Sequence, residues 1–195
     1  MEFFVLGRDH DDFEGHSDEL NERHWSYLDG AADRLVARGP TLDGEGEHTG
    51  SVHIVRLADH ATAVAFAHDE PYWLAGLYAT LEVVPFRNLL GATMWQRERL
   101  PGVAPSWLAC SRWAVPCAPP EVELGRAASA LRADRSLVFC GLLLDLTATG
   151  AIGLVAGFDA PAPVLPAAVA ALDELVGGTP HEATVERWQR GGRSQ

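Results

Sequence analysis

Hydrophobic and polar positions in the first hundred residues follow two spacings, one extended and one helical. A run of apolar residues without polar alternation predicts a strand covered on both faces, and apolar positions three or four apart predict a helix. Ser17 has the character of a helix N-cap, while Gly39 and Pro40 would end that helix. The order is strand–helix–strand–helix–strand, with room for one more strand near Thr41. The predicted strands are residues 3–7, 51–57 and 81–86, and the predicted helices are residues 17–38 and 61–68.

The second half of the chain repeats this plan. A Thr-Gly pair at residues 49–50 precedes one strand-like run, and a second pair at residues 149–150 precedes the corresponding run. A repeat of about a hundred residues is long enough for a core of its own, so we interpret it as two small domains. They cover residues 1–98 and 105–193, with a linker near residues 100–105 and a frayed tail at 191–195. The predicted strands of the second half are residues 107–112, 152–158 and 183–188, and its predicted helices are residues 121–132 and 167–176.

The pattern of each half predicts a ferredoxin-like α+β unit with its helices on one face of the sheet. Because the strands are apolar on both sides, the other face of each sheet also needs a cover. Each sheet can cover the other when the two pack face to face. We therefore predict an α+β protein of two ferredoxin-like domains packed as an intramolecular pseudo-dimer.

Composition narrows the class of partner. A formal net charge of −12 argues against nucleic acid and anionic membranes, which need clustered Lys and Arg. No apolar run approaches the roughly 20 residues that span a bilayer, and the N-terminal residues lack the features of a signal peptide. The three cysteines are odd in number and lack metal-ligand spacing, which is typical of free thiols in a reducing compartment. We expect a soluble, cytoplasmic protein.

Seven of the eight histidines lie in the first half, and His24 is the most informative of them. It follows Leu20 by four residues and precedes Leu28 by four, so it lies on the buried face of the predicted helix. One interpretation is a core histidine bonded to a backbone carbonyl, which the spacing alone favours. The other is a general base, because the pKa of imidazole lies near neutrality.

A catalytic histidine needs an acidic partner that holds one ring nitrogen. Asp69 and Glu70, before a proline, and Asp9, at the end of the first strand, are the candidates, although Asp69 and Glu70 also fit a solvated helix end. His53 points to the sheet face opposite its neighbours and would contact substrate if that face lines a cavity between the sheets. His48, His53 and His24 lack a recognised metal-ligand spacing, so we predict no metal site.

Two blocks of sequence resemble the YCII-related family. The first is Arg23-His24-Trp25-Ser26-Tyr27-Leu28, followed by residues 37–40 and Thr49-Gly50-Ser51. The second is Glu70-Pro71-Tyr72-Trp73-Leu74-Ala75-Gly76-Leu77-Tyr78, followed by Val84-Pro85-Phe86-Arg87. The match covers roughly residues 1–95, and the second half resembles a degenerate copy.

This resemblance implies a ferredoxin-like fold of the dimeric α+β barrel type and a catalytic His–Asp pair. The histidine corresponds to His24, and the acidic residue before proline corresponds to Glu70, where the family usually has Asp. Asp69 could replace it, and the key aspartate could also be the one matching Asp9. Most members of the family have no assigned reaction, and one branch is a dehydrochlorinase acting on a chlorinated hydroxyhydroquinone.

These observations predict a cofactor-independent enzyme of lyase or isomerase type that acts on a small molecule. His24 would abstract a proton with help from Glu70, in one cleft between the two copies. His53, Tyr72 and Arg87 are the candidate substrate-binding residues. Two alternatives remain open, a protein that binds a small metabolite without converting it and an accessory subunit. A cleft smaller than about 300 Å³ would favour the accessory role. A further homodimer is also left open.

Overall fold

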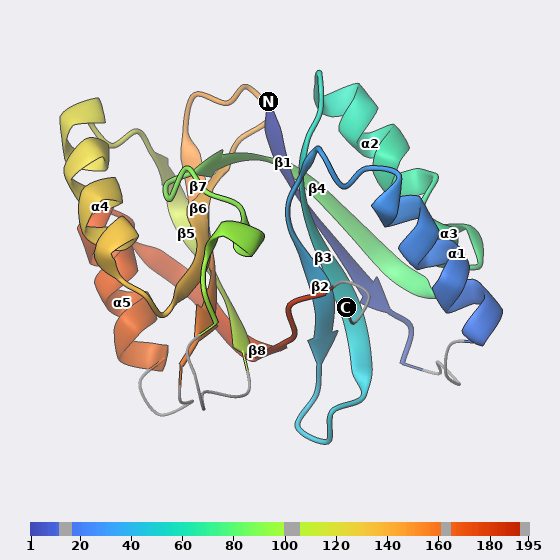
Figure 1. Ribbon diagram of the computed structural model, residues 1–195. Coiled ribbons are helices and arrows are strands. Elements are labelled where there is room, and N and C mark those ends of the chain that lie inside the picture. Colours follow the sequence, from blue (N-terminus) through green and yellow to red (C-terminus); the bar gives the residue numbers. More distant parts are fainter. Residues whose placement is uncertain (12–16, 100–105, 161–164, 192–195) are drawn as a thin grey trace.

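The structure is a computed structural model that describes residues 1–11, 17–99, 106–160 and 165–191. Within these residues, antiparallel strands join into one closed barrel with helices on its outside (Figure 1). The fold is therefore mixed α+β with an antiparallel sheet, as the hydrophobic pattern predicts. The predicted linker at residues 100–105 and most of the predicted tail, residues 192–195, lie outside the described residues.

The first half of the chain forms one side of the barrel. Its strands lie in the order β4-β1-β3-β2, and helices α1 and α2 cover their outer face. The elements are β1 (Glu2–Asp9), α1 (Asp18–Asp29), β2 (Leu35–Leu42), β3 (His48–Arg56), α2 (His60–His68), α3 (Pro71–Leu74), β4 (Tyr78–Asn88) and the short 3₁₀ helix η1 (Met94–Gln96).

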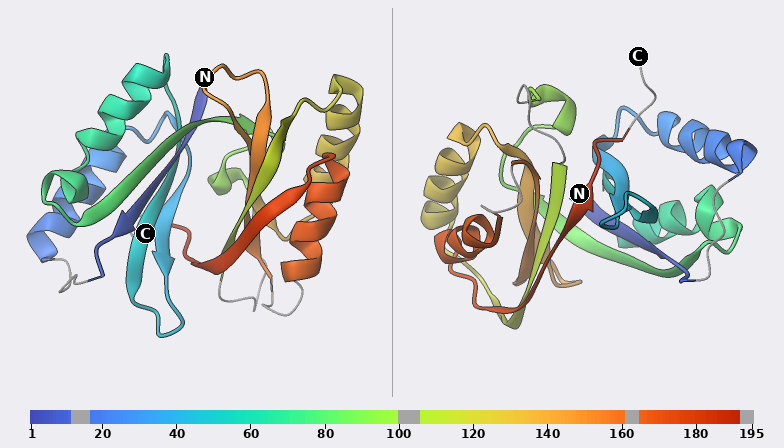
Figure 2. Two further views of the ribbon diagram at one scale, coloured as in Figure 1. Left: turned by 180° about the vertical axis from the view of Figure 1, so that it is seen from behind. Right: turned by 90° about the horizontal axis from the view of Figure 1, so that it is seen from below.

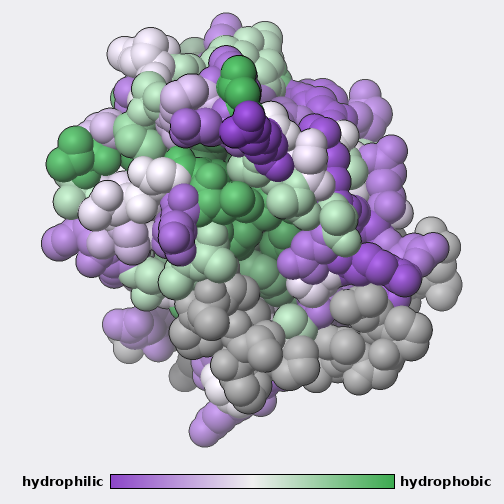
Figure 3. Space-filling view, turned by 90° about the vertical axis from the view of Figure 1, so that its left-hand side faces the viewer, coloured by the Kyte–Doolittle hydropathy of each residue, from purple (hydrophilic) through white to green (hydrophobic). Residues whose placement is uncertain are grey.

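The second half forms the other side, with strand order β6-β7-β5-β8 and helices α4 and α5 outside. Figure 3 views the outer side of this half, where apolar residues gather in a hollow among hydrophilic ones. The elements are β5 (Ser106–Cys117), α4 (Glu121–Ala133), β6 (Leu137–Leu144), β7 (Ala151–Asp159), α5 (Leu165–Leu175) and β8 (Pro180–Trp188). None of the described helices has the length and apolar character needed to cross a bilayer.

Two edge pairings close the barrel. Thr41 of β2 pairs with Trp188 of β8, and Phe86 of β4 pairs with Leu143 of β6. The two sides of the barrel face each other across a shared interior, and their edges are hydrogen-bonded, which two separately stacked sheets would not require (Figure 2). Apolar side chains from both halves fill the interior, and these include Phe4, Ile54, Val52, Phe139, Val155 and Trp188.

The first helix is shorter than predicted. Ser17 is its N-cap, as expected, and its side chain accepts a hydrogen bond from the backbone N–H of Leu20. However, α1 ends at Asp29, and the residues from Leu35 onward form strand β2. The apolar spacing continues through this boundary, but pairing with β3 and β8 outweighs the helical pattern. Residues 35–42 thereby enter the sheet, and the strand expected near Thr41 is this one.

The second half contains one strand that the sequence analysis did not assign. β6 is a continuous apolar run in which all residues from Leu137 to Leu143 are buried. A short run of this kind cannot be distinguished from a buried helix by its spacing alone. The other five predicted elements of this half lie where they were expected, with boundaries that shift by a few residues.

Candidate functional site

Helix α1 places His24 against the sheet of the first half. The N-cap at Ser17 sets where the helix starts, and the face carrying His24 and Leu28 is the buried one. His24 is only 6% exposed, and its Nδ1–H donates a hydrogen bond to Oε1 of Glu70. The hydrogen-bond partner of His24 is therefore a carboxylate. It is not a backbone carbonyl, which the interpretation as a core histidine expects.

Glu70 holds this position because it also caps the next helix. Glu70 is the N-cap of α3, and Pro71 at the first helical position has no N–H to donate. The carboxylate of Glu70 therefore accepts hydrogen bonds from the two residues after Pro71. Oε2 accepts from the backbone N–H of Tyr72 at 3.0 Å and of Trp73 at 3.2 Å. Glu70 is 1% exposed, and its two carboxylate oxygens are divided between the helix and the imidazole.

Tyr72 forms the next layer of the site. Its ring stacks on that of His24, with centroids 4.0 Å apart and an angle of 8° between the planes. Its hydroxyl donates to Oδ1 of Asn21 at 2.7 Å. Burial and the negative charge of Glu70 raise the pKa of Tyr72, so the phenol stays protonated at neutral pH.

A second histidine–carboxylate pair lies beside the first. The Nδ1–H of His48 donates to Oδ2 of Asp9 at 2.6 Å, which leaves Nε2 to accept from the hydroxyl of Ser51 at 3.3 Å. His48 and Tyr72 meet edge to face, with centroids 5.9 Å apart. Sequence analysis named Asp9 but paired it with His24, and it weighed His48 only as a metal ligand. The Thr-Gly-Ser motif before Val52 was the available signal for Ser51.

His53 faces α1 and not the barrel interior. Its ring lies 5.7 Å from that of His24, and only 2% of the residue is exposed. Burial, together with the nearby positive charge of Arg38, holds the pKa of His53 well below its usual value. This imidazole is therefore neutral at physiological pH. Arg38, which sequence analysis did not name, lies opposite it on β2.

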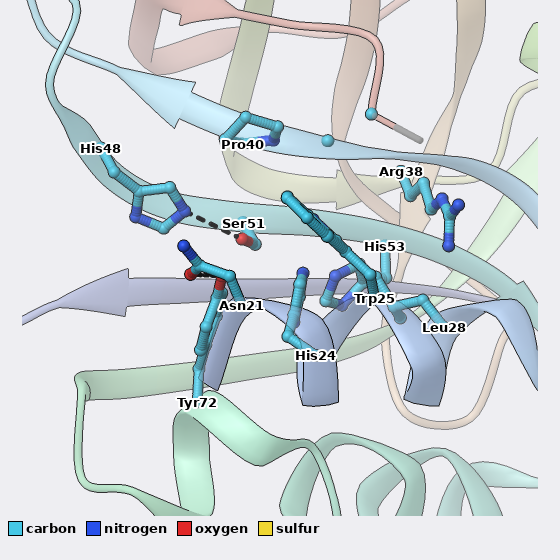
Figure 4. Close-up of a pocket in the computed structure, with 12 residues that line it drawn as sticks. Asn21, His24, Trp25, Leu28, Arg38, Pro40, His48, Ser51, His53 and Tyr72 are labelled. Atoms are coloured by element: carbon cyan, nitrogen blue, oxygen red, sulfur yellow. Dashed lines mark hydrogen bonds between the residues drawn. The ribbon is translucent and has the colours of Figure 1, made fainter. Parts of the chain in front are cut away.

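These residues line one pocket between α1 and strands β2 and β3 (Figure 4). The predicted cleft between the two halves is wrong, because apolar side chains fill the barrel interior and the pocket lies on the helix-covered face. The second half contributes little more than Gly191, near the chain end. The lining residues are Asn21, His24, Trp25, Leu28, Arg38, Gly39, Pro40, His48, Ser51, His53, Tyr72 and Gly191.

The volume of this pocket is about 180 Å³. An engineered cavity of about 150 Å³ in another protein binds benzene, so this one has room for one six-membered ring. This volume is below about 300 Å³, the size under which an accessory role is favoured. Trp25, which is 40% exposed, forms part of the pocket wall that reaches solvent.

Two predicted site residues lie elsewhere. Asp69 is exposed at the C-terminal end of α2 and does not line the pocket. Arg87 forms a two-pronged ion pair with Glu121 of α4, at 2.6 and 2.7 Å, on the surface. Arg87 lies within the edge pairing of β4 with β6, opposite Leu142, and it does not line the pocket. Among the described residues, no three His, Cys, Asp or Glu side chains are arranged to hold a metal ion.

Comparison with known proteins agrees with this geometry in the first half of the chain. Residues 1–87 match the YCII-related domain family. The N-terminal half is a YCII-related domain. Its histidine and its acidic residue before proline are the hydrogen-bonded pair His24 and Glu70, of which His24 lines the pocket. No curated protein matches the chain significantly.

Solved structures resemble the whole chain in fold. A proposed monooxygenase from Lactobacillus acidophilus superimposes on 97% of this chain and 93% of its own, with a TM-score of 0.53 and 9% identity. One from Fusobacterium nucleatum covers 97% of this chain and 91% of its own, with a TM-score of 0.54 and 8% identity. These are ferredoxin-like dimeric α+β barrel proteins, so the YCII-related domain here is part of a fold that spans both halves.

A smaller solved protein is similar to part of the chain. It is 5-chloro-2-hydroxyhydroquinone dehydrochlorinase from Burkholderia phenoliruptrix, in complex with 2,5-dihydroxybenzoquinone. The two sequences are 23% identical over 45% of this chain and 94% of the dehydrochlorinase, with a TM-score of 0.37.

Proposed function

We propose that this protein is a cofactor-independent enzyme that moves a proton on a small substrate, in a lyase or isomerase reaction. The observation that carries the proposal is the buried His24–Glu70 pair, whose histidine lines a pocket. With its Nδ1–H held by the carboxylate, the ring presents Nε2 as the basic atom. The same carboxylate stabilises the imidazolium that forms once His24 has taken the proton.

The second pair supplies the opposite half of the proton transfer. His48, held by Asp9, would take up a proton from solvent at Nε2, the atom in contact with Ser51, and return it to the substrate. Tyr72 contacts both imidazoles and forms the wall between them. An enzyme that removes a proton at one position and delivers one at another needs two such groups. In this assignment Glu70 partners His24, and Asp9 partners His48.

The finer organisation of the chain is also part of the proposal. The two halves, residues 1–98 and 105–193, are tandem YCII-type copies that form an intramolecular pseudo-dimer, the second having lost its site. Both halves run strand–helix–strand–strand–helix–strand, which supports a duplication. We place the protein in the cytoplasm, with a small molecule as its partner and no nucleic acid or membrane. A further homodimer is compatible with this arrangement.

One experiment tests the proton-transfer role directly. The purified protein is incubated in D₂O with a library of small carbonyl compounds and one-ring phenols, and the mixtures are analysed by mass spectrometry. We expect at least one compound to yield an isomer or an elimination product, with deuterium incorporated at carbon. His24→Asn should abolish this conversion, and His181→Asn, at an exposed position outside the pocket, should leave it unchanged. Full turnover by a folded His24→Asn protein would overturn the proposal.

The pocket volume favours a second candidate. A site of about 180 Å³ is below the range of most ligand pockets, which suits a protein that binds a small metabolite or serves as an accessory subunit. In this case the same library would yield ligands but no products. Binding would also be equal in the wild-type and His24→Asn proteins.

A further inference from the structure

Arg38 is a buried cation with unused hydrogen-bond donors. The residue is 6% exposed, and NH2 of its guanidinium donates to Oδ1 of Asp29 at 2.8 Å. Its Nε and NH1 atoms are buried and have no hydrogen-bond partner among the described residues. A buried guanidinium normally has its donors satisfied, because leaving them unpaired destabilises the fold.

His53 presents another unpartnered polar atom at the same place. Arg38 and His53 are directly opposite each other on β2 and β3, and both side chains face α1. Cross-strand neighbours of this kind have Cβ atoms about 5 Å apart. Nε2 of His53 is buried and has no partner among the described residues. Figure 4 shows both side chains on the strand side of the pocket, across from His24 and Leu28 on the helix side.

The charges around this pair favour an anion. His53 is neutral, so Arg38 brings the positive charge to this wall. Asp29 meets only one end of the guanidinium, and Glu70 is committed to His24 and to the α3 backbone. An anionic oxygen beside Arg38 would accept from the unused N–H groups, and the low dielectric of a buried site strengthens this attraction.

We propose that the pocket binds a small carboxylic acid, with its carboxylate on Arg38 and His53 and its carbon skeleton beside His24. The pocket holds about one ring, so a one-ring or short-chain acid is the largest that fits. The rings of His24 and His53 are 5.7 Å apart, which places the carbons next to the carboxylate within reach of the imidazole. The identification of these carbons as the reacting ones rests on the proposed function, whereas the binding of the acid does not.

The test compares benzoate with benzamide, which has nearly the same shape but no charge. Isothermal titration calorimetry measures both ligands on the wild-type, Arg38→Met and Arg38→Lys proteins. We expect benzoate to bind at least about tenfold more tightly than benzamide, and Arg38→Met to remove this preference. Arg38→Lys, which keeps the charge, should restore part of it. Arg87→Met is the matched control, because Arg87 is paired with Glu121 outside the pocket.

A second variant, Asp29→Asn, tests the proposal even if Arg38→Met does not fold. In Asp29→Asn the cation keeps its place but loses a neutralising charge, so benzoate should bind more tightly than in wild type while benzamide does not change. The proposal is wrong if benzoate and benzamide bind wild type equally, if neither binds, or if a folded Arg38→Met protein retains the preference for benzoate. It is also wrong if Asp29→Asn weakens benzoate binding.

The calorimetry separates this inference from the proposed function. His24→Asn, which should abolish turnover, should still bind benzoate in preference to benzamide. Loss of turnover with retained binding supports both proposals. Retained turnover in His24→Asn would overturn the catalytic role of His24 and leave the carboxylate site to be judged by the Arg38 variants alone.

Discussion

At the scale of single residues, Glu70 connects folding with chemistry, because one of its oxygens caps α3 and the other holds His24. Two substitutions separate these roles. Glu70→Gln keeps an oxygen that can cap the helix but loses the charge, so it should fold almost normally and reduce turnover by about a hundredfold or more. Glu70→Ala also loses the cap and leaves His24 unpaired, which should lower the free energy of unfolding by about 2–4 kcal/mol.

Urea unfolding of the two variants checks this prediction, together with the D₂O assay. The conservative variant Glu70→Asp is a useful third measurement, because its shorter side chain can reach the helix N–H groups or His24 but not both as well. Equal stability of Glu70→Gln and Glu70→Ala would show that the cap contributes little.

His53 gives a prediction on pH. Its folded-state pKa is lowered by burial and by the neighbouring positive charge of Arg38, so the unfolded chain binds the proton first as the pH falls. Stability contributed by the neutral ring is complete above the unfolded-state pKa of about 6.5 and declines below it. Between pH 7.5 and 5.5 this residue should remove on the order of 1 kcal/mol of unfolding free energy.

Urea unfolding at the two pH values measures this loss. His53→Gln should be less sensitive to acid by that amount, and His181→Gln, at an exposed site, should behave as wild type. If His53→Gln loses as much stability between these pH values as wild type does, the imidazole is not kept neutral in the folded protein.

At the scale of elements, Gly39 allows the chain end to lie on β2. A Cβ atom there would come within 1.9 Å of the backbone oxygen of Gln189, so a side chain cannot fit unless the segment moves. Gly39→Ala should therefore destabilise the protein by about 1–3 kcal/mol, as other overpacked sites do. Thermal unfolding measures the change, and Gly44→Ala is the control because nothing lies within 4 Å of its Cβ position. Equal melting temperatures would contradict this packing.

The same region shows where sequence patterns predict elements and where they do not. The N-cap at Ser17 is a local signal, and the structure confirms it. The end of α1 is not local, because Leu35 continues the helical spacing but is held in the sheet by Val55 of β3. β6 was not predicted for a related reason. Its apolar run fits a strand or a buried helix, and pairing with β4 and β7 makes it a strand.

At the scale of the whole molecule, the closed barrel makes the halves depend on each other. The edges of β2 and β4 are covered by strands of the second half, and the interior packing is shared. We predict a single cooperative unfolding transition for the full chain, with fluorescence and circular dichroism changing together. Residues 1–98 alone should aggregate or self-associate, because open edges and an apolar sheet face become exposed. Two separate transitions, or a stable monomeric fragment, would contradict this.

The pocket illustrates the same limit of sequence reasoning. The residues alone left Asp69, Glu70 and Asp9 open as partners of His24. The family resemblance pointed to the acidic residue before Pro71, and this is the contact that forms. Arg38 and His48 were missed as site residues since their roles come from the pairing of β2 with β3 and from the approach of β1. Local spacing in the sequence does not indicate either relation. The barrel interior, where the sequence predicts a cleft, is filled by apolar side chains.

The double attachment of Glu70 has a consequence for evolution. Purifying selection for a well-folded protein is enough to keep a side chain with an oxygen acceptor before Pro71, since the helix cap requires one there. A descendant that has lost its reaction can therefore retain an intact-looking dyad for many generations. Among homologues, drift at Arg38 and His53, which cap no helix, should be the more sensitive marker of lost or altered activity.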